Sequence, residues 1–274
     1  MSLSVNTNAG ALIALQNLTS TESQLSTAQN QVSTGLAISA PSDNGAVWAI
    51  AQNQRGQATA LDAVKQSLQR TQSAVDVATS AGTSVSDLLN QLKTAALSAS
   101  DTSLNTTSRS ALNAQFTSIL GQITKIVSSA SFNGSNLISS SNNLAALANA
   151  DGTSQLTVAG QNLSLGGSNI SVTATTTIST ATAAKNALAL INTSISQTNN
   201  ALAKLGTSSN ALGDQLTFVS NLQDTITTGV GNLVDANLAA ESAKLQALQT
   251  KQSLGIQALS IANSSSSSLL SLFR

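Results

Sequence analysis

The sequence LDAVKQSLQRTQSAVDVATSAGTSVSDLLNQLKTAALSA, residues 61–99, decides the fold. Stepping alternately three and four residues along it gives a stripe in which only Thr71 and Gly82 are poorly suited to a helix seam. The stripe consists of Leu61, Val64, Leu68, Thr71, Val75, Ala78, Gly82, Val85, Leu89, Leu92, Ala96 and Ala99. Because Gln, Ser and a few charged residues fill the other positions, the pattern predicts a long coiled-coil helix that needs a partner helix.

A second long stripe supplies the natural partner. The same stepping from residue 188 gives Leu188, Ile191, Ile195, Thr198, Leu202, Leu205, Ser209, Leu212, Leu216, Val219, Gln223, Ile226, Val230 and Leu233. We expect the two stripes to pack against each other in a seam within one subunit. The second stripe contributes to this seam the residues Leu202, Leu212, Leu216, Val219 and Ile226. The alternative is that the first stripe contacts another subunit.

Both ends of the chain carry weaker apolar stripes with few charges. An isolated pair of such helices would bury little surface, so we expect them to be ordered in an assembly. The predicted assembly residues are Leu15, Leu18, Leu25, Val32 and Leu36 at the start, and Leu245, Leu248, Leu259, Leu269, Leu272, Phe273 and Arg274 at the end. In the second half of the last helix, Gly255 and Ala262 continue the stripe.

The middle of the chain changes character. Pro41 breaks the first helix, and the next helix is expected from about residue 43 to 100. After a polar loop at residues 101–107, a third helix should fold back antiparallel on the second, with Leu112, Phe116, Ile119, Ile123 and Ile126 on one stripe. Residues 133–179 contain turn signals and period-two alternation at 156/158, 163/165 and 170/172, which predict hairpins, with a short helical piece possible at 144–150.

We therefore expect a mainly α fold: an elongated antiparallel helical hairpin or coiled-coil rod built from both terminal regions, with a small β-hairpin-rich central insertion. The expected domains are 1–40 with 234–274 as a terminal coiled coil, 41–132 with 180–233 as the rod, and 133–179 as an insertion at the outer end of the rod.

The amino-acid composition excludes most catalytic and metal-binding sites. The 274 residues include no cysteine and no histidine, so the chain lacks the commonest metal ligand and general base. We expect no enzyme activity, no cofactor and no metal site. With 8% charged residues and zero net charge, nucleic acid and anionic membranes are not expected partners. The first basic residue is Arg55, so a secretory signal is not expected either.

Short motifs at both ends and beside the insertion, taken in order, resemble those of the bacterial flagellins. The matching segments are VNTN at 5–8, VSTGLAI at 32–38, DN at 43–44, AIA at 49–51, FNG at 132–134, LVDANLAAE at 233–241 and LLSLFR at 269–274. The resemblance covers roughly residues 4–140 and 184–274, and the insertion is short for such a protein.

The resemblance implies a structural subunit that polymerises into the helical flagellar filament, outside the cell, and serves swimming motility. It also implies unfolded export by the flagellum-specific type III route without a cleaved signal. The implied partners are further copies of the chain or other flagellins, the export apparatus and an export chaperone, and the filament cap and junction proteins. The alternative is a hook-filament junction protein, which shares the terminal helices and forms a short ring.

Overall fold

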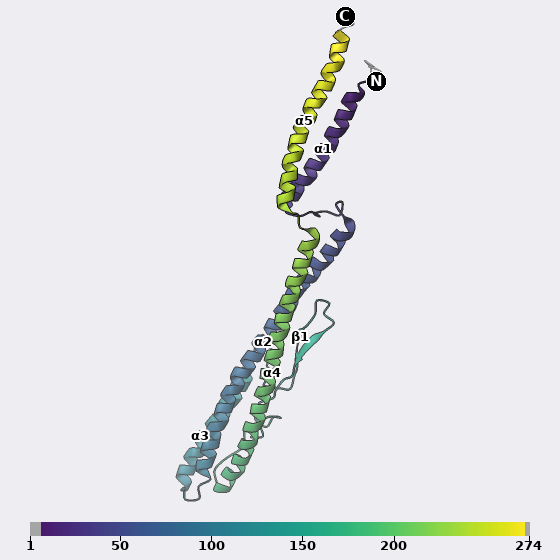
Figure 1. Ribbon diagram of the computed structural model, residues 1–274. Helices are drawn as coiled ribbons and strands as arrows, with labels where there is room; N and C mark the ends of the chain where they lie inside the picture. Colours follow the sequence, from purple (N-terminus) through teal and green to yellow (C-terminus); the bar gives the residue numbers. More distant parts are fainter. Residues whose placement is uncertain (1–6, 272–274) are drawn as a thin grey trace. The chain divides into compact units, whose positions relative to one another are not determined.

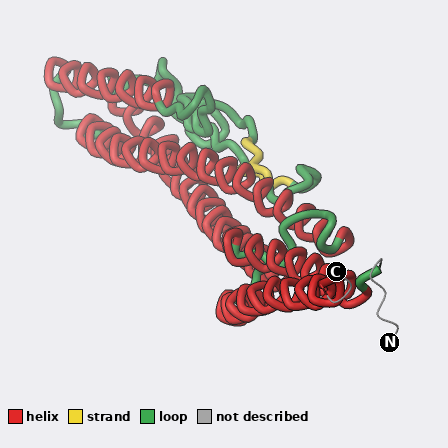
Figure 2. The backbone as a smooth tube through the Cα atoms, turned by 90° about the horizontal axis from the view of Figure 1, so that it is seen from above, coloured by secondary structure: helices red, strands yellow, loops and turns green. Residues whose placement is uncertain are grey.

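The computed structural model describes residues 7–271, with side chains described through residue 264. In this part of the chain, five helices and one two-stranded antiparallel sheet form a mainly α fold, as the sequence predicts (Figures 1 and 2). The elements are α1 (Ala9–Thr34), α2 (Gly45–Ala99), α3 (Thr106–Ser129), β1 (Leu144–Leu147), β2 (Gln155–Val158), α4 (Ala181–Val234) and α5 (Leu238–Ser271).

The chain divides into two compact units. Unit 1 comprises Met1–Gly56 and Thr225–Arg274, and unit 2 comprises Gln57–Asp224. The division differs from the expected domains in two respects. The boundaries lie within α2 and α4, at residues 56/57 and 224/225, rather than at residues 40 and 233, because the first turns of α2 and the last turns of α4 share a small core with residues 36–38. The insertion is part of unit 2, since it packs on that unit's helices instead of forming a core of its own.

The seam between α2 and α4 is the core of unit 2. All twelve positions of the stripe that begins at Leu61 are buried. Opposite them, the buried α4 residues repeat at three and four residues up to Leu205 and at seven residues beyond it: Ala184, Ala187, Ile191, Ser194, Thr198, Ala201, Leu205, Leu212 and Val219. Polar side chains link the rims, for example Lys65 Nζ to Gln223 Oε1 at 3.1 Å and Gln72 Nε2 to Ser209 Oγ at 2.7 Å.

Helix α3 runs antiparallel to α2, as predicted. Near its start, Arg109 Nε donates to the Ala99 carbonyl oxygen at 3.0 Å, and Asn105 caps the helix by accepting from the Ser108 amide. At its other end, Ile126 and Ala130 lie beside residues 76–81 of α2. Phe116, Ile119, Leu120, Ile123 and Val127 form its buried face. With 24 residues, α3 spans about 36 Å, so it returns along only part of α2.

The insertion lies along the flank of α2 and α4, not at the outer end of the helices. In Figure 1 the β1 segment lies beside α2 and α4, and two hydrogen bonds fix it there. The Leu147 amide donates to Ser67 Oγ of α2 at 3.1 Å, and Gln215 Nε2 of α4 donates to the Ala148 carbonyl oxygen at 3.0 Å. The short α3 explains this place, because it releases the chain partway along α2.

The internal structure of the insertion also differs from expectation. Residues 144–147 form strand β1, not a helical piece, and pair with β2 in a register that joins Leu144 to Val158. The alternating segments at 163/165 and 170/172 are irregular. Leu163, Ile170 and Val172 are nevertheless fully buried. The period-two alternation of these residues therefore indicates side chains buried against the helices, not paired strands.

Unit 1 joins α1 and α5 to the start of α2 and the end of α4. Gly35 ends α1 in the left-handed conformation, with φ +73°. Beyond it the Ala37 amide donates to the Val234 carbonyl oxygen at 2.7 Å, and Leu36 bridges Asp235. Residues Ala51, Val230 and Val234 form a small core, against which Leu36, Ile38, Val47 and Ile226 pack.

Two expectations about the end of α4 need correction. Leu233 is not a seam residue: it is 43% exposed, and its neighbour Val234 is buried instead. Ile226 is half-buried, but it packs on the small core of unit 1 rather than on the long seam of unit 2. Among the described residues, no helix has the length and apolar character needed to cross a membrane.

Candidate assembly surface

Helices α1 and α5 pair antiparallel within unit 1 (Figure 1). The side chain of Asn8 caps α1 by accepting from the Ala11 amide, and its Nδ2 donates to the Ala262 carbonyl oxygen of α5 at 2.8 Å. Further along the pair, Leu25, Ala28 and Leu248 form a buried cluster, with Leu245 packed against it. The two ends of the described chain therefore lie at the same end of this unit.

The contact between α1 and α5 is narrow. Among their described side chains, the buried apolar ones are Leu25, Ala28 and Leu248. Burying a leucine stabilises a fold by about 1.5–3 kcal/mol, whereas ordering each backbone residue costs about 1–2 kcal/mol before helix hydrogen bonds form. Two helices of 26 and 34 residues held by so few buried side chains are marginal as an isolated pair.

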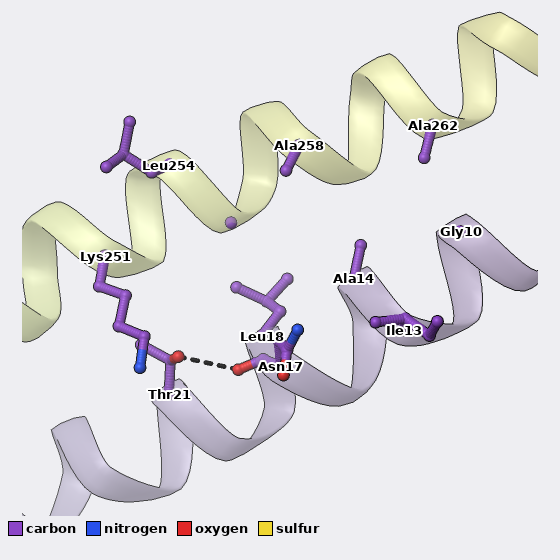
Figure 3. A pocket seen from close by; sticks show the side chains of 11 residues that line it. Gly10, Ile13, Ala14, Asn17, Leu18, Thr21, Lys251, Leu254, Ala258 and Ala262 are labelled. Carbon is purple, nitrogen blue, oxygen red and sulfur yellow. Dashed lines mark hydrogen bonds between the residues drawn. The ribbon is translucent and has the colours of Figure 1, made fainter.

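Small residues bring the two backbones close and leave a groove beside the contact. A Cβ at Gly255 would lie 3.3 Å from Leu18 Cδ1. Figure 3 shows Ala14 and Leu18 pointing from α1 toward α5, and Ala258 and Ala262 pointing back. The resulting groove has a volume of about 560 Å³ and is lined by Gly10, Ile13, Ala14, Asn17, Leu18, Thr21, Lys251, Leu254, Gly255, Ala258 and Ala262.

Large apolar side chains on the outer faces of this pair face solvent. Ile13 is 61% exposed and Leu254 is 59% exposed, both on the groove. Others lie elsewhere on the two helices: Leu12, Leu15, Leu238, Ile256 and Ile261. Single exposed apolar residues are ordinary, but several on two nearly uncharged helices indicate a surface that another protein covers.

The predicted assembly residues occupy different environments. Leu25 and Leu248 are buried between α1 and α5, while Leu18, Val32, Leu245 and Leu259 are half-buried. Leu36 packs on the core at the end of α4. Leu15 does not lie on the pairing face but is 49% exposed, because the true stripe of α1 runs through Ala11, Ala14, Leu18, Thr21, Leu25 and Ala28. The Leu269 side chain and residues Leu272, Phe273 and Arg274 lie outside the described part.

All the predicted seam residues except Ile226 belong to unit 2. In unit 2, Leu61, Val64, Leu68, Val75, Val85, Leu89, Leu92, Leu212 and Val219 are buried, and Leu202 and Leu216 are half-buried. Sequence reasoning missed the exposed wall residues Ile13 and Leu254 of the groove. It also missed the small residues Ala14 and Ala28 on the α1 face, whose three- and four-residue spacing from Leu18 and Leu25 could have revealed them.

Few charged side chains lie on α1 and α5 or in the loop that follows α1. Asp43, in the loop before α2, accepts from the amides of Ala40 and Ser39, and these hydrogen bonds hold the pKa of its carboxyl below the ordinary value. The described residues contain no cluster of three or more acidic, histidine or cysteine side chains placed to hold a metal ion. The exposed apolar side chains of α1 and α5 make this weakly charged helical surface the candidate functional feature.

Comparison with known proteins points the same way. Residues 5–143 match the bacterial flagellin N-terminal helical region, and residues 188–273 match the bacterial flagellin C-terminal helical region. The chain is 57% identical to flagellin FljN of Caulobacter vibrioides, over 99% of this chain and 98% of the relative. It is 55% identical to flagellin FljM of the same species with the same coverage, and 37% identical to a flagellin of Brucella melitensis over 99% of both chains. The chain belongs to the bacterial flagellin family.

Proposed function

We propose that this chain is a structural subunit that polymerises into the flagellar filament outside the cell. The observation that carries the proposal is the pair of α1 and α5, whose few buried contacts leave large apolar side chains exposed along nearly uncharged helices. Packing these helices against those of other copies would bury the exposed side chains and supply the stabilisation that the pair lacks. Identical subunits joined by one repeated heterologous contact form an open helical filament when the rotation between them does not close into a ring.

Unit 2 serves in this proposal as the folded body of the subunit. Its seam residues are satisfied by internal contacts between α2 and α4, so they are not available for assembly. The role is structural rather than catalytic. We also infer export through the flagellar channel with help from an export apparatus and chaperone, and growth beneath a cap. The absence of cysteine and the single proline support passage of an unfolded chain.

Seeded elongation tests the proposal. Purified monomer is added to short filament fragments and followed by electron microscopy. We expect long filaments; failure to elongate, or growth of short rings only, would contradict the filament role.

A truncated chain provides the second arm. Removing residues 269–274 deletes the apolar end of the sequence, and we expect elongation to stop while circular dichroism still shows the helices of unit 2. Normal filaments from the truncated chain would show that this segment is dispensable for assembly.

A further inference from the structure

Two charges on the α1 and α5 pair have no partner within the described chain. The charged residues of these helices are Glu22, Glu241, Lys244 and Lys251. Lys244 Nζ lies 3.2 Å from Glu241 Oε2, which pairs those two within α5. Across residues 7–264, whose side chains are described, Glu22 and Lys251 make no such ion pair. The pair of helices thus presents one negative and one positive charge that remain open to another molecule.

The positive charge belongs to the groove. Lys251 lies at one end of it and extends toward Thr21 of α1, as Figure 3 shows. The opposite end lies at Gly10 and Ala262. Between the two ends the lining combines the small Ala14, Gly255 and Ala258 with the larger Leu18, and larger side chains could enter over the small residues. The eleven residue-to-residue steps from Lys251 to Ala262 span about 16 Å of helix.

The negative charge belongs to a different face of α1. Leu12 and Leu15 line a shallow surface together with Gln16, Thr19, Ser20, Ser23 and Gln24, and none of these residues lines the groove. Glu22 follows Leu15 by seven residues, which places it two turns further along the same side of α1. Leu12, Leu15 and Glu22 form an edge, here called the α1 edge, that combines two exposed leucines with one open carboxylate.

The α1 edge and the groove match in length, polarity and charge. From Leu12 to Glu22 the edge spans about 15 Å, close to the length of the groove. When an α1 from another copy lies parallel to the α1 that borders the groove, Leu12 comes to the Ala262 end and Glu22 to the Lys251 end. The leucines then cover the small residues of the groove, and the carboxylate meets the ammonium group.

We propose that the α1 edge of one subunit seats in the groove between α1 and α5 of the next, with Glu22 paired to Lys251. This inference rests on the proposed filament function and names the contact that builds it. Since the edge and the groove are different faces of the same pair, each subunit can use both at once. Such a contact is heterologous, because it joins two different surfaces. It therefore leaves one free edge and one free groove after two subunits have joined, and further subunits can add.

Charge reversal with reciprocal rescue tests the contact. Glu22→Lys and Lys251→Glu each place like charges together, whereas the double variant E22K/K251E restores an opposite pair in reversed order. The assay is growth of each variant without wild-type fragments, so that every contact joins two copies of the same variant, with the critical monomer concentration measured by sedimentation at low and at high salt. Lys244→Glu is the control, because it makes the same change of charge on α5 outside the groove, and the surface ion pair with Glu241 that it removes contributes little to stability.

We expect each single reversal to raise the critical concentration about fivefold or more at low salt, with less effect at high salt because salt screens the charges. The double variant should return to within about twofold of wild type, and K244E should remain near wild type. Circular dichroism of each monomer checks that helix content is unchanged.

Other outcomes would overturn the contact. Single variants that grow like wild type, a double variant as impaired as the two singles combined, or an effect of K251E without one of E22K would each do so. In all three cases wild-type growth would leave the proposed filament function standing. Absence of wild-type growth would remove both the function and the contact that rests on it.

Discussion

Gly82 tests whether the seam between α2 and α4 is packed as closely as the structure shows. A Cβ at this position would lie 2.7 Å from Leu202 Cδ2 and 3.4 Å from Leu163 Cδ1. Gly213 provides a matched control on the facing helix, because a Cβ there would meet nothing within 4 Å. Both glycines lie inside long helices, so the change in helix propensity on substitution by alanine is the same.

The two substitutions should change stability in opposite directions or by clearly different amounts. Replacing a helical glycine by alanine stabilises by about 1 kcal/mol, which is the full expected effect of Gly213→Ala. At Gly82 the added methyl also overpacks the seam, at a cost of about 1–3 kcal/mol. Since the nearest atom is the end of a leucine side chain, we expect a net loss of about 0–2 kcal/mol for Gly82→Ala.

Urea unfolding of the full-length monomer, followed by circular dichroism, measures both effects, and hydrogen exchange in residues 75–92 assigns the transition to unit 2. The double variant G82A/L202A adds a coupling test. If the added methyl occupies the space left by the shortened Leu202, the double variant should be less destabilised than the sum of the single variants. Equal stabilisation by Gly82→Ala and Gly213→Ala would refute the close approach.

Three further predictions concern other parts of the chain. Leu89→Ala, at a fully buried seam position, should destabilise unit 2 by about 2–5 kcal/mol, while Leu97→Ala, which is 57% exposed on the same helix, should change it by less than about 0.5 kcal/mol in urea unfolding. Ser67→Ala removes the acceptor of a backbone amide in the insertion, and hydrogen exchange there should accelerate about fivefold, for a loss of about 1 kcal/mol. The pKa of Asp43 is lowered in the folded state, so the stabilisation that its carboxylate gives the loop is present above the unfolded pKa and is lost as pH falls through the lower folded pKa. The amide NMR shifts of the loop should therefore change below about pH 4. Asp43→Asn should abolish that change.

The helical seam could be predicted because its information is local and repeated. Every stepped position from Leu61 to Ala99 is buried, since each three- or four-residue step keeps to one face of the helix. Along α4 the same stepping was one residue off at both ends: Ala187, Ser194 and Ala201 are buried where Leu188, Ile195 and Leu202 were expected, and Val234 is buried where Leu233 was expected. A helix with 3.6 residues per turn drifts about 20° per heptad from a 3.5-residue repeat, and this drift accumulates along a helix of 54 residues.

The insertion could not be predicted in the same way, because strand formation depends on partners that alternation does not specify. Leu156 and Val158 lie in β2, but Leu163 and Ile170 are held by irregular backbone contacts. For example, the Leu163 amide donates to the Ile138 carbonyl oxygen at 2.8 Å, outside any strand. Of the six apolar residues in the alternating pairs, four are buried and two, Leu156 and Leu165, are half-buried, and the secondary structure was identified only in part.

The candidate surface was predictable in its location but not in its face. Few charges and weak stripes single out the terminal helices from sequence, with Leu15 as a predicted assembly residue; in the structure Ala14 faces α5 and Leu15 is 49% exposed. Leucine dominates any hydrophobic pattern, yet alanine permits the closer approach between two helices. A groove forms where small residues let two helix backbones approach closely. The hydrophobic pattern of a sequence does not indicate that distance.

The seam of unit 2 and the α1 and α5 pair of unit 1 differ in how much further burial an assembly could add, although Leu97 and Phe218 of unit 2 are also 57% exposed. Leu89 and Leu92 of unit 2 are fully buried without any other subunit, so a second copy gains nothing by contacting them. Ile13 and Leu254 of unit 1 remain mostly exposed, so each can contribute further burial only in an assembly. Polymerisation that depended on α1 and α5 would then couple their ordering to filament growth, because the same contacts that join subunits would stabilise the marginal pair. A monomer built this way keeps a stable body while its helical ends become fully stable only in the filament.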